Sequence, residues 1–220
     1  MAFAVGQNSM QNEIYGASQF DYLLYLPKNY DERRKYPLLV FLHGAGERGN
    51  DLSVLKCHSI PKIFDRDVEY EAVVVSPQCK FGRTWSSNPE QIITFIRDMI
   101  GKYSIDENAI SITGISMGGF GTWQTIMDCP SLFAAAAPIC SGGMAWRADV
   151  IADLPIRIYH GEADDVVNVF YSKDMYRALK ERNAVDASLF LYPNVGHDVG
   201  NYAYEQTDLI DWLISKKRSK

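Results

Sequence analysis

The 220-residue chain lacks the features of several protein classes. No apolar run reaches the length needed to cross a bilayer, and the first seven residues lack the charged start of a signal peptide. Its four cysteines show neither C-x-x-C nor zinc-ligand spacing, and the sequence contains no H-E-x-x-H motif and no phosphate-cradling glycine loop. We therefore expect a cytoplasmic protein that uses no metal and no cofactor.

Positive charge is scarce and scattered. The chain has 22 basic and 27 acidic residues, and its only basic cluster is the tail Lys216–Lys220. Nucleic-acid-binding domains gather Lys and Arg on one face, so the sequence predicts no nucleic-acid partner and no membrane partner. The tail is expected to be solvated and to complement the dipole of the last helix.

Residues 1–220 are predicted to form a single domain, because no linker divides the chain and 47% of its residues are hydrophobic. Short apolar runs alternate with helical patterns, which favours an α/β fold with a mostly parallel sheet flanked by helices. Strands are expected near Phe20–Leu26, Pro37–Leu42, Ala72–Ser76, Ala109–Thr113, Ala134–Ile139, Ile156–Tyr159 and Ser188–Leu191. Helices are expected after Asn88 and Pro89, which suit a cap and a first helical position, and near Ser172–Arg182 and Glu205–Ser215.

The stretch SITGISMGGFG places Ser116 between Gly114 and Gly118. The β-branched residues before it favour a strand, and the residues after it can begin a helix. A G-x-S-x-G serine at such a strand-to-helix turn is exposed as a nucleophile over the end of the sheet. The alternative is an ordinary serine in a glycine-rich turn.

Only four histidines are available as the general base that a serine nucleophile needs. His43 and His160 each follow an apolar strand and precede a glycine, so we expect them to steady loops. His58 has no neighbours that suggest chemistry. His197 lies in the loop YPNVGHD after the last expected strand, where open α/β folds place functional groups. His197 is therefore the predicted base, and a surface loop histidine is the alternative.

An acidic residue between Ser116 and His197 is expected to orient the imidazole, since a triad of this kind follows the chain order Ser, Asp, His. The stretch YHGEADDVV offers Asp164, which we prefer, and Asp165 as the runner-up. Asp198 is less suitable, because adjacent side chains in an extended loop tend to diverge.

Four motifs together resemble an α/β-hydrolase of the small serine-esterase type. They are HGAGERG from His43, GISMGG from Gly114, HGEADDVV from His160 and GHD from Gly196. The chain is similar to esterases related to feruloyl esterases and polyhydroxybutyrate depolymerases, and to the catalytic domain of prolyl oligopeptidases. Because the triad acid in such families stands four residues after the His-Gly histidine, the resemblance implies Asp164.

Two backbone amides are expected to stabilise the negative charge that gathers on the attacked carbonyl oxygen. One is the amide of Met117, directly after the nucleophile. The resemblance implies that the other is the amide of Ala45, with Gly44 and Gly46 shaping its loop.

The length of one connection between expected strands indicates which substrates to expect. Only the residues Ser141–Pro155 connect two of the expected strands, which is too few for a cap domain. An open site favours soluble carboxylic esters with short-chain, phenolic or carbohydrate-linked acyl groups. Trp85 is expected either to stack on a substrate ring or to pack on the next helix. We call the segment His43–Gly46, which contains Ala45, the oxyanion loop. Arg48 is expected beside this loop, as a substrate contact or paired with Glu47.

The expected function is thus a serine carboxylesterase that works through an acyl-enzyme. The alternatives are a prolyl oligopeptidase-like serine peptidase, a thioesterase or acyltransferase, and a non-catalytic binding protein of the same fold. The sequence does not encode the oligomeric state.

Overall fold

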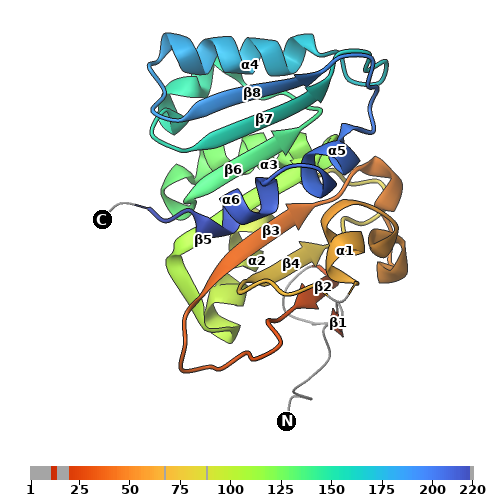
Figure 1. Cartoon of the computed structure of the whole chain (residues 1–220), viewed down its shortest axis with the longest axis vertical. Coiled ribbons are helices and arrows are strands. Elements are labelled where there is room, and N and C mark those ends of the chain that lie inside the picture. The colour runs from red at the N-terminus through yellow and green to blue at the C-terminus, as the bar shows by residue number, and fades with distance from the viewer. Residues whose placement is uncertain (1–10, 14–19, 67, 88, 219–220) are drawn as a thin grey trace.

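A computed structural model describes residues 11–13, 20–66, 68–87 and 89–218, and the described strands form one eight-stranded sheet (Figure 1). The strands are β1 (Gln11–Glu13), β2 (Tyr22–Tyr25), β3 (Tyr36–Leu42), β4 (Val73–Pro77), β5 (Ile105–Ile115), β6 (Ala135–Ile139), β7 (Ile156–Gly161) and β8 (Ala187–Tyr192). Their order is β1-β2-β4-β3-β5-β6-β7-β8. Strand β2 pairs antiparallel with both of its neighbours, β1 and β4, and all the other neighbouring pairs are parallel.

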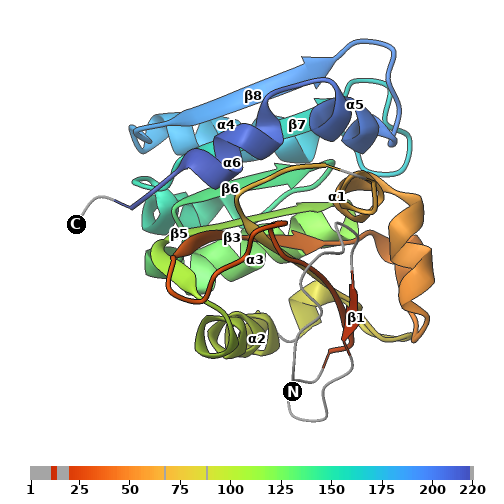
Figure 2. The ribbon, with the colours of Figure 1, turned by 60° about the horizontal axis from the view of Figure 1, so that its bottom comes forward.

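Helices cover both faces of this sheet. They are α1 (Ser59–Phe64), α2 (Pro89–Lys102), α3 (Met117–Asp128), α4 (Phe170–Glu181), α5 (Val199–Glu205) and α6 (Leu209–Ser215). Short 3₁₀ helices include η1 (Ala45–Glu47), η2 (Leu52–Cys57), η3 (Trp85–Ser87), η4 (Pro130–Leu132) and η5 (Ala145–Ile151). Figure 2 separates the layers, with α1, α5 and α6 on one face of the sheet and α2 and α3 on the other.

Strand β3 is covered by helices on both of its faces, and its sequence is apolar on both. Leu38, Val40 and Leu42 pack into the core beneath α2, α3 and α4. Leu39 and Phe41 alternate with them and pack into the core beneath α1, α5 and α6. A parallel strand that is buried on both faces needs such a continuous apolar run.

All seven expected strands are present, and so are the helices expected after Pro89 and near Ser172–Arg182. The helix expected over Glu205–Ser215 begins only at Leu209, as α6, because Glu205 ends the preceding helix α5 and a short break separates the two. The 3-residue β1 and the 6-residue α1 were not expected, because segments this short carry little periodicity. Asn88, the expected cap, lies outside the described residues.

The connection between β6 and β7 contains only the 3₁₀ helix η5 among its regular elements, so this part of the chain forms no cap domain. All four cysteines carry free thiols; Cys140 is buried, whereas Cys129 is partly exposed. In the described part of the chain, no helix combines the length and apolar character of a bilayer span.

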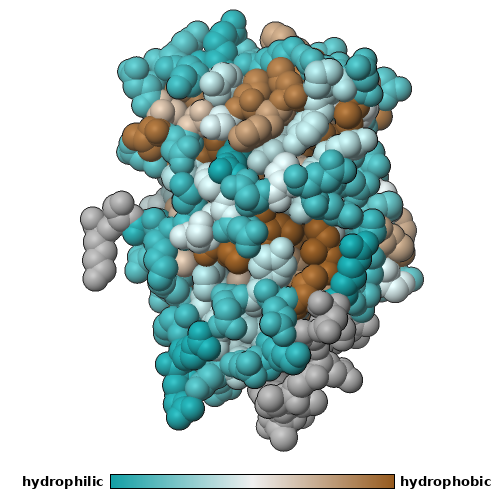
Figure 3. All heavy atoms as spheres, in the orientation of Figure 1, coloured by the Kyte–Doolittle hydropathy of each residue, from teal (hydrophilic) through white to brown (hydrophobic). Residues whose placement is uncertain are grey.

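The face of the molecule in Figure 3 is mostly hydrophilic, with apolar residues exposed over β8. Phe190 of this edge strand is 38% exposed and stacks on Tyr159 of the neighbouring strand β7. The edge of the sheet is therefore less completely covered than its centre, where β3 and β5 lie.

Candidate active site

Three residues that are distant in sequence meet at the carboxyl edge of the sheet. Ser116 follows β5, Asp164 follows β7 and His197 follows β8. His197 Nε2 lies 2.8 Å from Ser116 Oγ, and His197 Nδ1 lies 2.8 Å from Asp164 Oδ2. Because these strands run parallel, their carboxyl ends present the three side chains to one place.

The backbone at Ser116 adopts an uncommon conformation, with φ 56° and ψ −119°. Glycines permit the tight turn around it: a Cβ added to Gly114 would lie 2.5 Å from the Gly118 carbonyl oxygen. The Ser116 amide donates to the Ile139 carbonyl at 2.9 Å, which ties the turn to the neighbouring strand β6. This turn holds the hydroxyl over the end of the sheet.

The Asp164 carboxylate has a donor on each oxygen. Its Oδ1 accepts from the amides of Val166 and Val167 at 2.9 and 2.8 Å, and its Oδ2 accepts from His197. Burial by itself raises the pKa of Asp164, but the hydrogen bonds from His197, Val167 and Val166 outweigh it and lower the pKa below its ordinary value. Asp164 is therefore a carboxylate at neutral pH and holds His197 with Nε2 free to accept a proton.

The two amides expected to form the oxyanion hole each begin a helical element. Ala45 is the first residue of η1, and Met117 is the first residue of α3. The amides of the first helical residues have no acceptor within their own helix. Ala45 and Ser116 line the same cavity, and Met117 directly follows Ser116 in the chain. Neither amide therefore has an acceptor within its own helix.

A cavity of about 400 Å³ opens beside the Ser116 hydroxyl. Its described lining consists of Phe41, His43, Gly44, Ala45, Gly46, Glu47, Leu55, His58, Ser59, Ile115, Ser116, Val166, His197 and Asp198. This lining contains two carboxylates, on Glu47 and Asp198, but no Lys or Arg side chain. The cavity therefore suits a neutral, partly apolar group.

His43 steadies a loop, as expected from its place after a strand. Its Nε2 accepts from the Cys79 amide at 2.9 Å, and its Nδ1 lies 2.6 Å from the Gly44 carbonyl oxygen, which requires Nδ1 to be the protonated nitrogen. Burial lowers the pKa of His43 to about 4, so the ring is neutral at pH 7. The neutral ring joins the start of the oxyanion loop to the loop after β4.

Trp85 takes the second of its two expected roles, and the expectation of a stacking wall is wrong. The side chain is 2% exposed and does not line the cavity. Its Nε1 donates to the His43 carbonyl at 2.9 Å, while its ring packs against Phe20 and His43. Trp85 therefore supports the oxyanion loop from behind and cannot reach a substrate ring.

Arg48 likewise contacts backbone and does not line the cavity. Its Nε donates to the Ala45 carbonyl at 3.0 Å, and Nη1 donates to the Arg83 carbonyl at 3.4 Å. Glu47, its expected partner, turns to the other side, where Oε2 lies 3.8 Å from His43 Nδ1. Arg48 thus braces the turn at Ala45, and Glu47 is the side chain that faces the cavity.

The alternative acids lie apart from the imidazole contact. Asp165 is exposed to solvent, and Asp198 accepts hydrogen bonds from Asn201. The cavity wall also includes His58 and Ser59, for which the sequence suggested no role. No local pattern could have revealed them, because they reach the site only through the packing of α1 against α5.

The comparison with known families agrees with this geometry. Residues 70–207 match the phospholipase/carboxylesterase family, and this segment contains Ser116, Asp164 and His197. The chain belongs to this family. Its α/β-hydrolase fold, with a mostly parallel sheet between helices, is the fold expected from the sequence.

Several esterases are similar to this family member. The probable feruloyl esterase C of Aspergillus terreus is 25% identical, over 86% of this chain and 72% of that protein. The bifunctional acetylxylan esterase/xylanase of Neocallimastix patriciarum is 31% identical, over 67% of this chain and 22% of that protein. The chain spans only 20% of an uncharacterized secreted protein of Arthroderma benhamiae and 12% of the endo-1,4-beta-xylanase Y of Acetivibrio thermocellus.

Solved structures share the fold. A thermostable esterase superposes with a TM-score of 0.81 at 33% identity, covering 96% of this chain and 64% of that one. The feruloyl esterase module from Clostridium thermocellum complexed with sinapinate has a TM-score of 0.75 at 17% identity, covering 96% of this chain and 90% of that one. The latter likeness concerns the fold alone.

Proposed function

We propose that this protein is a serine carboxylesterase that hydrolyses soluble carboxylic esters through an acyl-enzyme on Ser116. The observation that carries the proposal is the continuous chain of hydrogen bonds from Ser116 Oγ through His197 to Asp164, with both links at 2.8 Å. A serine hydroxyl becomes a useful nucleophile when an oriented imidazole can take its proton.

Acylation begins when His197 Nε2 accepts the hydroxyl proton while Ser116 Oγ bonds to the acyl carbon. The carbonyl electron pair moves onto the carbonyl oxygen, which the amides of Ala45 and Met117 stabilise. When this intermediate collapses, the bond to the alcohol oxygen breaks and His197 returns the proton to the leaving alcohol. The carboxylate of Asp164 stabilises the imidazolium during this step.

Deacylation repeats the sequence with water. His197 removes a proton from a water molecule, and the resulting oxygen nucleophile attacks the acyl carbon of the Ser116 ester. The same two amides hold the second oxyanion. Collapse of that intermediate releases the carboxylic acid and returns the proton to Ser116 Oγ.

The substrate class follows from the cavity and from the relatives. A cavity of about 400 Å³ with apolar walls accommodates a short acyl chain or a phenolic acyl group. Because the described chain builds no cap over it, a bulky or carbohydrate-linked alcohol can extend into solvent. Relatives named feruloyl esterase and acetylxylan esterase support phenolic and acetyl esters of carbohydrates as the first compounds to test.

A panel of esters tests the proposal. The purified protein would be assayed on acetyl to feruloyl esters of simple alcohols and of sugars, together with a p-nitrophenyl ester and a matched peptide amide. We expect ester hydrolysis that disappears in Ser116→Ala and labelling of Ser116 by a fluorophosphonate. Faster cleavage of the amide than of the ester would favour a peptidase, and absence of both labelling and hydrolysis would favour a binding protein.

A further inference from the structure

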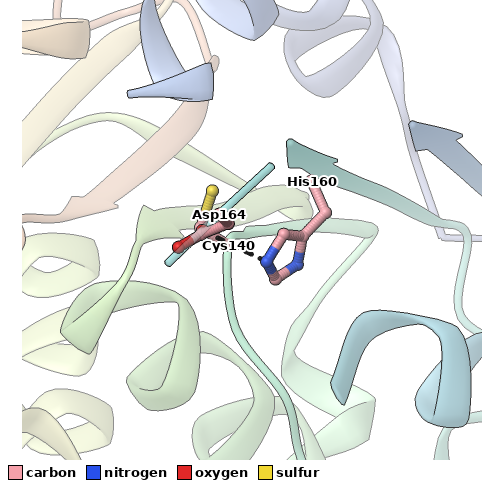
Figure 4. Close-up of side chains that lie close together, drawn as sticks. All are labelled: Cys140, His160 and Asp164. Atoms are coloured by element: carbon pink, nitrogen blue, oxygen red, sulfur yellow. Dashed lines mark ion pairs between the residues drawn. The ribbon is translucent and has the colours of Figure 1, made fainter. Parts of the chain in front are cut away.

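A second histidine contacts the same oxygen of Asp164 that holds His197. His160 Nε2 lies 3.2 Å from Asp164 Oδ2, and both side chains are completely buried (Figure 4). The His197 Nδ1 to Asp164 Oδ2 distance is 2.8 Å. One carboxylate oxygen therefore lies between two imidazole rings.

The surroundings of His160 determine which nitrogen carries its proton. Nε2 also lies 2.8 Å from the Val167 carbonyl oxygen, so both groups facing Nε2 are acceptors and Nε2 must be a donor. Burial lowers the pKa of His160, which keeps the ring neutral at pH 7 and leaves Nδ1 without a proton. The Ser172 hydroxyl lies 2.7 Å from Nδ1 and 2.9 Å from the Ser141 carbonyl oxygen, and its single proton is shared between these two acceptors.

Cys140 completes this buried cluster. Its Sγ and the ligand atoms of His160 and Asp164 lie within 4.8 Å of one another, a grouping that could suit a metal ion. However, both Asp164 oxygens and both His160 nitrogens already have hydrogen-bond partners. Burial raises the pKa of Cys140, so its sulfur stays a neutral thiol, 3.5 Å from the His197 carbonyl oxygen. The cluster is thus a support for the carboxylate.

We propose that His160 is a positioning residue of the catalytic triad, which fixes the Asp164 carboxylate and weakens its hold on the protonated form of His197. This inference rests on the proposed function. The His160 N–H donates to the Val167 carbonyl at 2.8 Å and faces Asp164 Oδ2 at 3.2 Å, so it holds the carboxylate beside the loop that also supplies its amide donors. It takes up part of the negative charge on Oδ2, which leaves less charge to stabilise an imidazolium at His197.

The expected pH dependence involves every titratable side chain that contacts the pair. Asp164 lies between the two histidines, Cys140 remains a thiol beneath them, and the Asp198 carboxylate is bonded to Asn201. Without the His160 donor, Asp164 favours protonated His197 more strongly. The acid side of the activity profile then moves to higher pH.

The test replaces His160 by Leu, which fills the space without a donor, and by Gln, whose amide can reach the position of Nε2. The readout is the rate of Ser116 labelling by a fluorophosphonate between about pH 5 and pH 8.5, which depends on His197 but on no particular ester. We expect His160→Leu to slow labelling about tenfold at neutral pH and to move the acid limb upward by about half a pH unit. His160→Gln should restore most of the labelling rate and return the acid limb most of the way to its position in the parent protein.

Ser111→Ala is the matched control, because Ser111 is also buried and donates one hydrogen bond, to the Leu213 carbonyl, on the far side of the core. It should lower stability without moving the acid limb. A folded His160→Leu protein with an unmoved limb and a rate within about twofold of the parent would overturn the proposal.

Should His160→Leu fail to fold, His160→Asn provides the decisive variant. Its shorter amide matches the position of Nδ1, beside Ser172, and leaves no donor at the position of Nε2, so the acid limb should move in the same direction. An unmoved limb in a folded His160→Asn protein would then overturn the positioning role. If the parent protein itself neither labels nor hydrolyses esters, the proposed function fails and the role of His160 fails with it. Normal parental activity with unaffected variants refutes the role of His160 alone.

Discussion

Gly118 packs against the Leu42 carbonyl oxygen so closely that a Cβ at position 118 would lie 1.9 Å from that oxygen. This contact joins the first turn of α3 to the end of β3. Helix α3 follows Ser116 and begins with Met117, and strand β3 leads into the loop of Ala45. The two proposed oxyanion donors are therefore positioned by a direct approach of one backbone to another.

Gly118→Ala should consequently damage both stability and activity, because the added methyl group cannot avoid a backbone oxygen without moving β3 or α3. Thermal unfolding and ester turnover would measure the loss. Gly101→Ala in α2 is the control, since nothing lies within 4 Å of the added Cβ there. That change should stabilise the protein by about 0.5–1 kcal/mol. Equal effects of the two substitutions would contradict the packing argument.

Substitution of the triad should separate the roles of two adjacent acids. We expect Ser116→Ala and His197→Ala to lower turnover by several orders of magnitude, and Asp164→Asn to lower kcat by about 10⁴-fold, as in the serine-protease precedent. Asp165→Asn should stay near the parent rate, because Asp165 is exposed. Steady-state kinetics on one ester would decide, and a larger loss in Asp165→Asn would reverse the assignment.

Buried His43 should make the fold sensitive to mild acid. Its pKa is lowered from 6.5 to about 4 by burial, so between these values the unfolded chain binds a proton that the folded protein does not. Stability therefore falls as the pH drops through this window, by on the order of 3 kcal/mol for this ring. The depressed pKa of Asp164 acts elsewhere, since its contribution is lost only below the ordinary range of an aspartate.

The measurement is urea unfolding at several pH values. His43→Gln keeps an acceptor for the Cys79 amide but cannot titrate, so its stability should change less between neutral pH and about pH 4.5 than that of the parent. If the free energy of unfolding changed with pH by the same amount in both proteins, His43 would not be the cause of the acid sensitivity.

Glu47 should make the enzyme discriminate against anionic esters. Its side chain is 19% exposed and lines a cavity without Lys or Arg, and its buried Oε2 has no hydrogen-bond partner among the described atoms. An acyl chain that ends in a carboxylate would meet this charge at close range. We expect kcat/KM for such an ester to be about tenfold below that of a neutral ester of equal length.

The quantity to measure is the ratio of kcat/KM for the neutral ester to kcat/KM for the anionic ester. Glu47→Gln should lower this ratio, and added salt should lower it in the parent protein. Glu181→Gln removes an exposed carboxylate at the end of α4 and serves as the charge-matched control, with no expected change in the ratio. A ratio that Glu47→Gln leaves unchanged would place the charge discrimination elsewhere.

Local sequence determined much of this molecule, because it depends on short-range physics. Continuous apolar runs define the seven expected strands, and the glycines around Ser116 are required by a turn whose neighbouring backbones leave no space for Cβ atoms. The order and spacing of Ser116, Asp164 and His197 likewise follow from strands that end at one edge of a parallel sheet.

Only the tertiary structure decided what surrounds these residues. Trp85 is buried because it packs behind His43, and His58 reaches the cavity because α1 packs against α5. The contact of His160 with Asp164 depends on the turn directly after β7, in which the Asp164 amide donates to the Gly161 carbonyl. Such contacts depend on how separate elements pack in space, which residue spacing along the chain does not specify.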